Sequence, residues 1–461
     1  MNTKTYIGKW WLASNPAAKI PGTLTIEPDD EITLELVGSF VETERHVEVK
    51  KTDLILGVTS DTKEFSLLDC RMIHSSKSSV GVNTTSFSVD ISIMGGHFST
   101  VDDINFTAIW VCYSHLAEWV NISGFNIDNK FSEKKFVVTY TYPENIEVKI
   151  DDNLSLFIDI KPKLPKEFHL QTEATISQST YIRIMPSYSQ PLDYFKKIMR
   201  YIEQFLSLGM SEPVHALHIE GQSEAVKLEI NGKFYLLPLE IRRKVFGARS
   251  TERTLMPSDM LFTYDDIKDR FILLIKNWFN NYHNLSHIYN LYFATIYNPN
   301  MYLEQKFPYL IFAVEAFYNQ IIGGQYVSVE EYKTFYKNFV ECIPNNLSKE
   351  LRLSIMKLLE YGNELSLRRK LKNIFKRYDG VLRKYILDDH GFIARTVDTR
   401  NYEVHHDNRL ESRAAKGEDL YKLIFKLNLL LEVCLMAEMG FTEIEIDKLL
   451  SRKYRFLLIK K

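Results

Sequence analysis

The pattern of hydrophobic and polar positions changes once along the chain, near residue 264. Before this point, apolar and polar residues alternate in short runs, which is typical of half-buried β-strands. The runs at 23–26 and 32–36 enclose the polar turn 27–30 and predict a β-hairpin. Because turn residues recur about every ten positions, we expect an antiparallel sandwich or barrel and not a parallel α/β sheet. Further strands are expected at 46–50, 54–59, 65–71, 86–93, 105–112, 136–142, 146–150, 154–160, 172–184, 214–220, 225–230 and 233–237.

Helical periodicity interrupts the strand pattern once and then replaces it. Apolar residues recur on one helical face at 191–206, and from about residue 264 every strongly patterned segment has a period near 3.6. Pro308 is expected either to start its helix or to kink it. Repeated amphipathic helices imply an all-α bundle. The expected helices are 265–281, 285–295, 301–322, 329–340, 349–358, 366–378, 391–405 and 418–439, the last with Gly440 as its C-cap.

This change of period predicts the domain organisation. We expect a multidomain α+β protein, with a β-rich region at 1–245, a polar and basic linker at 246–262 and an all-α domain at 263–461. A chain of 461 residues is long enough for two or three domains. The sequence leaves open whether the β-rich region is one domain or two.

Composition and charge narrow the classes of function. The net charge is −2, so any nucleic-acid site must come from a local basic patch. The four cysteines lie far apart, which argues against a disulfide scaffold or a zinc site and favours a reducing cytoplasm. No apolar run reaches the roughly 18 residues that span a membrane. The chain also has no P-loop, Rossmann fingerprint or nucleophile elbow, so it gives no sign of NTP or dinucleotide dependence. Together with the cysteines and the short apolar runs, this predicts a cytoplasmic protein without a cofactor or metal.

The most informative stretch for chemistry is 399–407, which contains Arg400, Asn401 and His405. Metal-independent RNA cleavage needs a group that transfers protons and a cation that stabilises the crowded phosphorane. A histidine transfers protons near neutral pH, and an arginine donates bidentate hydrogen bonds to phosphate oxygens. Asn401 would orient the histidine or hold a phosphate oxygen. The competing interpretation is a polar helix end with a satisfied histidine.

Helix geometry restricts how these three residues act together. Asn401 and His405 are four apart and share a helical face. Arg400 and His405 are five apart, which places them about 140° apart around the axis. They therefore do not converge on one regular helix. Either Arg400 lies at an irregular helix start, or a second copy of the chain completes the site.

Two groups of residues resemble known families. An Arg-Asn-x3-His motif late in a helical bundle resembles the HEPN ribonucleases, and its flanks resemble the ApeA-type HEPN domain. Several N-terminal segments are similar to the N-terminal domain of ApeA-type anti-phage defence proteins. These segments are GKWWL at 8–12, KIPGTL at 19–24, LELVGSF at 34–40, WV at 119–120 and SGF at 123–125.

The resemblance implies an abortive-infection ribonuclease. The N-terminal half would be a sensor for a phage-derived trigger, and the C-terminal half an endoribonuclease with Arg400, Asn401 and His405 as catalytic residues. It also implies a homodimer or higher homo-oligomer through the HEPN domain, with the motifs facing each other. The substrate would be RNA such as tRNA, cut by attack of its 2′-hydroxyl. Glu315 occupies a place where such domains often have an acidic residue.

Other residues near the motif and upstream of it are auxiliary candidates. His406 would be a second proton carrier or an exposed neighbour, and Tyr402 would pack or would stack on a base. A basic helical stretch before the motif is either the RNA-binding surface or a solvated helix face. Its candidate residues are Arg368, Arg369, Lys372, Lys376 and Arg377.

Two alternatives from other functional classes stay open. In the first, the HEPN bundle is catalytically inactive and acts as a dimerisation or binding module beside a β-rich ligand-binding domain. In the second, the β-rich half is a carbohydrate- or protein-binding sandwich that performs the main function by itself.

Overall fold

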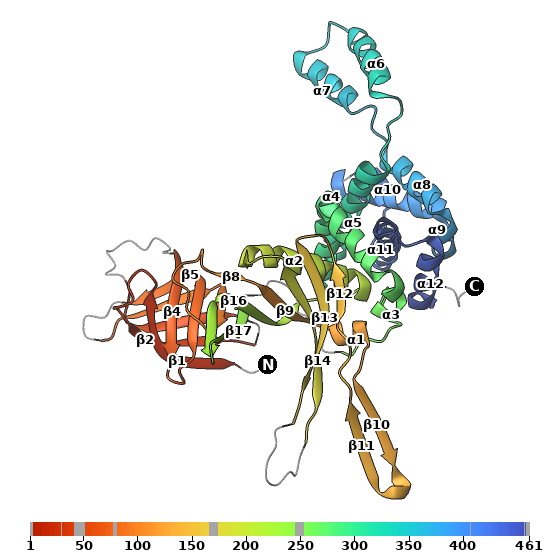
Figure 1. Cartoon of the computed structure of the whole chain (residues 1–461). Helices are drawn as coiled ribbons and strands as arrows, with labels where there is room; N and C mark the ends of the chain where they lie inside the picture. The colour runs from red at the N-terminus through yellow and green to blue at the C-terminus, as the bar shows by residue number, and fades with distance from the viewer. Residues whose placement is uncertain are drawn as a thin grey trace. The chain divides into compact units, whose positions relative to one another are not determined.

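A computed structural model describes residues 3–28, 30–40, 51–76, 81–165, 174–244, 253–405, 407–455 and 457, except for the side chain of His405. The chain divides into two compact units, Met1–Ile272 and Leu273–Lys461. The first is rich in antiparallel strands and the second is helical (Figure 1). This confirms the predicted fold class. The strand predicted at 46–50 lies outside the described residues.

Six antiparallel strands of the first unit close into a barrel in the order β4-β1-β2-β3-β6-β5, and β5 pairs with β4 again. The predicted hairpin is confirmed as β2 and β3, with Thr23 opposite Glu35. Inward-facing side chains such as Trp10, Leu34 and Phe65 are almost completely buried and fill the barrel. The strands are β1 (Lys4–Leu12), β2 (Ile20–Ile26), β3 (Ile32–Val37), β4 (Lys51–Thr59), β5 (Glu64–Ser76) and β6 (Thr84–Val89).

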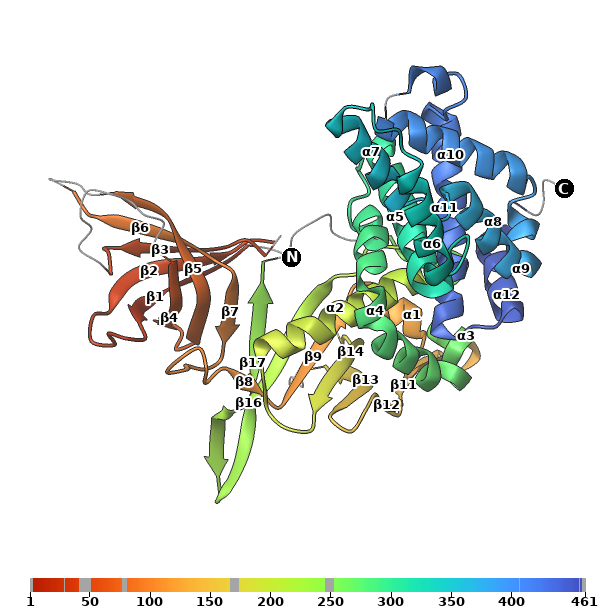
Figure 2. The same cartoon turned by 90° about the horizontal axis from the view of Figure 1, so that it is seen from above.

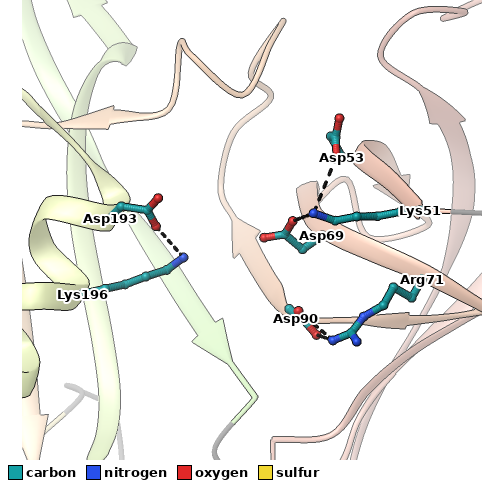
Figure 3. A network of polar contacts seen from close by, with 7 residues as sticks. All are labelled: Lys51, Asp53, Asp69, Arg71, Asp90, Asp193 and Lys196. Carbon is teal, nitrogen blue, oxygen red and sulfur yellow. Dashed lines mark hydrogen bonds and ion pairs between the residues drawn. The ribbon is translucent and has the colours of Figure 1, made fainter.

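Strand β5 changes its partner halfway along one edge. Its first half pairs with β7 (Ile91–Met94) and its second half with β6. At the change, Asp69 has φ +53°, a conformation that Asp tolerates better than most residues. Figure 3 shows the ion pairs at this corner, where Lys51 Nζ lies 2.7 Å from Asp69 Oδ1 and Arg71 Nη2 lies 3.1 Å from Asp90 Oδ1. These contacts join β4, β5 and the β6–β7 turn where the barrel closes.

The sheet continues beyond the barrel as β7-β17-β16-β9-β14-β13-β12. Four strand predictions are corrected here. The predicted strand 86–93 is two strands, β6 and β7, and the predicted strand 105–112 is β8 and β9, because each run changes partner. The runs at 214–220 and 225–230 form the single strand β16, which passes through a register shift between Gln222 and Lys227. The remaining strands are β8 (Asn105–Phe106), β9 (Ala108–Tyr113), β10 (Phe125–Lys130), β11 (Lys135–Tyr140), β12 (Ile146–Lys149), β13 (Leu154–Lys163), β14 (Ser177–Pro186), β15 (Gln190–Pro191), β16 (Ala216–Ile230) and β17 (Lys233–Arg243).

Helix α2 (Leu192–Met210) confirms the helix predicted at 191–206 and lies against the extended sheet (Figure 2). The short helices α1 (Leu116–Val120) and α3 (Tyr264–Ile267) pack beside it around Trp119, which is fully buried. Trp119 Nε1 donates to the carbonyl of Phe262 at 2.9 Å. Of the predicted linker 246–262, the structure describes 253–262, where Leu255, Met260 and Leu261 are buried.

The second unit is a helical bundle with a projecting helical hairpin (Figure 1). The helices predicted at 329–340, 349–358, 366–378, 391–405 and 418–439 are confirmed, and Gly440 has the left-handed conformation of a C-cap. The predicted break at 281–285 is wrong because α4 runs through it. The helices and the π-helical turn η3 are α4 (Phe271–Tyr297), α5 (Leu303–Phe317), η3 (Tyr318–Ile322), α6 (Val329–Glu341), α7 (Lys349–Glu360), α8 (Leu367–Arg377), α9 (Asp379–Tyr385), α10 (Asp389–His405), η4 (Asn408–Leu410), α11 (Gly417–Met439) and α12 (Glu443–Lys453).

Two details of the bundle concern single elements. Helix α5 starts at Leu303, so Pro308 lies inside it and does not begin it. Helices α6 and α7 form the projecting hairpin, and neither has a buried residue. Among the described residues, no helix has both the length and the apolar composition that crossing a membrane requires.

Helix α11 lies at the centre of the bundle and is buried along most of its length. Its Glu432 is 3% exposed and accepts hydrogen bonds from Lys453 Nζ at 2.8 Å and from the Tyr454 hydroxyl at 2.6 Å. Burial, together with the Glu432 carboxylate, raises the pKa of Tyr454, so the hydroxyl stays protonated and donates. These bonds hold the end of α12 on α11.

We expect Glu432→Ala to lower the free energy of unfolding by about 3 kcal/mol, because it leaves the Lys453 ammonium buried without its carboxylate. Urea unfolding of the full chain, followed by helical circular dichroism, measures the change. The matched control is Glu418→Ala, also on α11, whose pair with Lys422 is exposed and should contribute less than about 1 kcal/mol. Equal effects of the two substitutions would contradict this account of Glu432.

Candidate active site

Helix α10 holds the predicted Arg-Asn-x3-His motif without interruption. The helix begins at Asp389 and ends at His405, so Arg400 lies well inside it. This excludes the irregular helix start that would have let Arg400 and His405 converge. His405 is described only as the last backbone position of α10, and His406 lies outside the described residues. On an ideal α-helix, positions 400 and 405 are about 140° apart around the axis.

Arg400 and Asn401 form a hydrogen-bonded pair. Arg400 Nη1 donates to Asn401 Oδ1 at 3.2 Å, and both residues are partly buried. The bond fixes the orientation of the amide, so Asn401 Nδ2 is the donor left for another group. The pair thus places a guanidinium and an amide N–H side by side, and both are donor types that bind phosphate oxygens.

Buried threonines fix the rotation of α10. Thr399 is fully buried, and its Oγ1 donates to the carbonyl of Arg395 at 2.7 Å and accepts from the Ala415 amide at 2.9 Å. Thr396 is also fully buried and donates to the carbonyl of Phe392. Because Thr399 joins α10 to the segment before α11, the Arg400–Asn401 pair is held on the less buried side of the helix.

The segment after α10 covers Tyr402. Lys416 Nζ lies 4.9 Å from the centre of the Tyr402 ring, and Glu411 Oε1 lies 2.9 Å from the same ammonium. The hydrogen bond that Lys416 donates to Glu411 raises the pKa of Lys416, so the charge over the ring is retained. Asp407 caps η4 and pairs with Arg409, whose hydrogen bond lowers the Asp407 pKa. The charged side chains of this segment therefore pair with one another.

The structure also locates the acidic and basic candidates on neighbouring helices. Glu315 is partly buried on α5, which packs against α11 and α10. The five basic candidates are on α8, which packs against α10 and places the Phe375 ring 5.7 Å from the Phe392 ring. All five are exposed, and Arg377 lies 3.7 Å from Glu438. These residues are Arg368, Arg369, Lys372, Lys376 and Arg377.

Sequence reasoning missed the residues that surround these candidates. Lys416 near the motif, Tyr318 in η3 and Asn373 on α8 have no local signal of function. Thr399 begins the predicted stretch 399–407, but a Thr on the apolar side of an amphipathic helix predicts only burial. Among the described residues, no group of three or more His, Cys, Asp or Glu side chains is arranged to hold a metal ion.

Comparisons with known proteins match both units. A family model described as ApeA N-terminal domain 1 matches residues 5–278, which is more than half of the chain. A second, described as Apea-like HEPN, matches residues 310–445 and includes the whole of α10. Comparisons with curated proteins and with solved structures gave no significant match.

Proposed function

The chain belongs to the ApeA-type family with a C-terminal HEPN domain, and from this premise we propose that it is an endoribonuclease that cuts RNA at Arg400, Asn401 and His405. The family fits an anti-phage defence protein with a nuclease-type domain, and HEPN domains are generally ribonucleases. The observation that supports the proposal best is the Arg400–Asn401 hydrogen bond on an uninterrupted α10 that ends at His405.

Each residue has a separate role in the proposed reaction. His405 accepts the proton of the ribose 2′-hydroxyl or donates one to the leaving 5′-oxygen. The 2′-oxygen forms a bond to phosphorus and the 5′-oxygen leaves, so the products are a 2′,3′-cyclic phosphate and a 5′-hydroxyl. Arg400 stabilises the charge on the phosphorane oxygens, and Asn401 orients the phosphate or the imidazole. No metal is required for these steps.

A second copy of the chain completes the proposed site. Arg400 and His405 do not converge on one straight helix, and HEPN domains typically dimerise and bind RNA. A two-fold dimer uses the same surface of both copies, and in the proposed dimer α10 of one copy lies against α10 of the other at the axis. The Arg400 of one copy then faces the His405 of the other, and the dimer contains two equivalent sites. Glu315, Tyr402 and His406 are auxiliary candidates around them.

The proposed biological setting is the cytoplasm of a phage-infected cell. The substrate is RNA, with tRNA as the candidate, and the N-terminal unit binds a phage-derived trigger. A separate sensor domain suits an enzyme whose uncontrolled activity would destroy the RNA of its own cell. The two proposed domains follow the boundaries 1–245 and 263–461.

The decisive experiment identifies the ends of the RNA products. RNA from phage-infected cells that express the full chain should contain new 2′,3′-cyclic phosphate ends, and purified protein with the trigger should produce the same ends in EDTA. A substrate with a 2′-O-methyl group at the cut position should stay intact, because it lacks the attacking oxygen. Products with 3′-hydroxyl ends, formed only when divalent metal is added, would overturn the proposal.

A further inference from the structure

A cavity of about 700 Å³ lies between the π-helical turn η3 and the exposed side of α8. This volume is within the range of small-molecule sites. Its wall includes residues of η3, the Gly323–Gly324 turn, the segment before α6 and one face of α8. The α8 residues are Arg369, Asn373, Lys376 and Arg377.

The positive charge of this cavity is not balanced by acidic lining residues. Arg369, Lys376 and Arg377 line it, and no carboxylate is among its lining residues in the part of the chain that the structure describes. The guanidinium of Arg377 is partly neutralised by Glu438, 3.7 Å away. Arg369 and Lys376 form no ion pair with any described residue. An anion in this cavity would therefore meet two uncompensated cations.

Helix geometry divides the basic candidates of α8 into two groups. Positions 369, 373, 376 and 377 follow the i, i+4, i+7, i+8 spacing of one helical face, and this face lines the cavity. Arg368 and Lys372 are not among the lining residues, although both are exposed. The basic residues that were predicted as one surface are therefore divided. Arg369, Lys376 and Arg377 line the cavity, and Arg368 and Lys372 lie on the open face of α8.

The opposite wall provides an aromatic ring and fixed polar groups. Tyr326 is 58% exposed at the cavity, so one face of its ring can stack on a planar group. Tyr318 is buried, and its hydroxyl accepts from Asn373 Nδ2 at 2.6 Å. This bond orients the Asn373 amide and leaves its carbonyl oxygen as an acceptor. The cavity thus combines a stacking surface, cations and an oriented amide.

The rim beside Tyr326 is a glycine turn with constrained backbone. Gly323 and Gly324 have φ of +67° and +108°, in the region that side chains disfavour. A Cβ on Gly323 would have no neighbour within 4 Å, so this rim faces open space. The turn follows η3, and π-helical turns occur often at functional sites. The Gly323 N–H donates to the carbonyl of Tyr318, so the turn contributes a fixed backbone without side chains that a ligand can approach closely.

We propose that this cavity binds one nucleotide unit, with its phosphate on Arg369 and Lys376 and its base on Tyr326. Stacking on an aromatic ring and phosphate contacts with Arg or Lys are the two main components of single-stranded RNA binding. The inference rests on the proposed function, since α8 packs against α10 and the nucleotide would belong to the RNA that α10 cuts. A free mononucleotide has the same chemistry and is the other source that the experiment must separate.

The test measures RNA binding by the full chain with His405→Ala as parent, so that the RNA stays intact. Fluorescence anisotropy with a labelled single-stranded RNA, and competition by AMP, GMP or inorganic phosphate, give the dissociation constants. We expect Arg369→Ala/Lys376→Ala and Tyr326→Ala each to weaken RNA binding by about tenfold, and the cation variant to reduce the salt dependence as well. Thermal stability should not change, because all three side chains are exposed or at the rim.

Matched controls come from the projecting hairpin. Lys333→Ala/Lys337→Ala removes the same charge from exposed positions of α6, and Tyr361→Ala removes a tyrosine that is 66% exposed. None of these lines the cavity, so each should change RNA affinity less than about twofold.

The outcomes separate the cavity from the nuclease. If the cavity variants lose RNA affinity and the control variants do not, the cavity binds a nucleotide of the RNA. If the cavity variants lose affinity for AMP or GMP but keep their RNA affinity, the cavity binds a free nucleotide. Cavity variants that bind RNA and mononucleotides as the parent does would overturn the inference, even if wild-type protein cuts RNA. If RNA is bound through the cavity but never cut, the proposed function fails and the binding site stands.

Discussion

His405→Ala should abolish RNA cleavage by the full chain and its toxicity in phage-infected cells. We expect a fall in the single-turnover rate of roughly 10²–10⁴-fold, the usual contribution of a positioned general acid or base. Alanine removes both ring nitrogens and leaves the end of α10 helical, so the RNA is still bound but no group transfers its proton. The measurement is the rate at which 2′,3′-cyclic phosphate ends form with saturating protein.

His390→Ala is the matched control for this loss. His390 is on the same helix, in its first turn, and its side chain is 82% exposed. The substitution removes the same imidazole group as His405→Ala, but at the other end of the helix and outside the motif. Cleavage should therefore continue at the wild-type rate. If His405→Ala cut RNA as fast as His390→Ala, or if both variants and wild type left RNA intact, α10 would be an inactive dimerisation or binding surface.

A mixture of Arg400→Ala and His405→Ala chains should recover activity that neither variant has alone. In a two-fold dimer, one composite site of the mixed dimer loses both residues and the other keeps both. Random pairing makes half of the dimers mixed, each with one intact site of two, so we expect about a quarter of wild-type activity. Recovery of this size from two inactive proteins is a large effect.

Co-expression with two different tags and sequential affinity steps isolates the mixed dimer, whose expected activity is then about half that of wild type. The control dimer has both substitutions in one chain and a wild-type partner, and it should have no intact composite site. If the control dimer were active and the mixed dimer inactive, Arg400 and His405 of the same chain would form the site. The two dimers contain the same four residues and differ only in their distribution.

The hairpin of β2 and β3 and most of the helices could be predicted from the sequence because their signals are local. Alternation between 23 and 36 specifies both the strands and their register, since a one-residue slip would turn Leu24 and Leu34 outward. The helix at 391–405 was predictable in the same way. The spacing of Arg400, Asn401 and His405 then follows from helix geometry alone.

Other elements depend on contacts between distant residues. The polar run near 281–285 predicts a break, yet α4 continues because Tyr282 and Leu285 are buried and the Trp278 and Tyr289 rings stack at 4.3 Å. Packing here outweighs the local preference of the chain. The cavity beside α8 is a second case, since Tyr318 and Asn373 meet only in the folded bundle.

The pairing pattern of the first unit also has a consequence for the order in which a growing chain folds. All six barrel strands lie between Lys4 and Val89, and β7 pairs with β5 directly after them. The other edge of β7 stays without its neighbour until β17 is made, where Ile93 pairs with Ile241. During synthesis from the N-terminus, the barrel can close early, and the extended sheet is joined to it through β7 only after β17 has left the ribosome. Helix α10 with His405 emerges after both. A nascent chain therefore has its complete N-terminal unit before the Arg-Asn-x3-His motif of α10 exists.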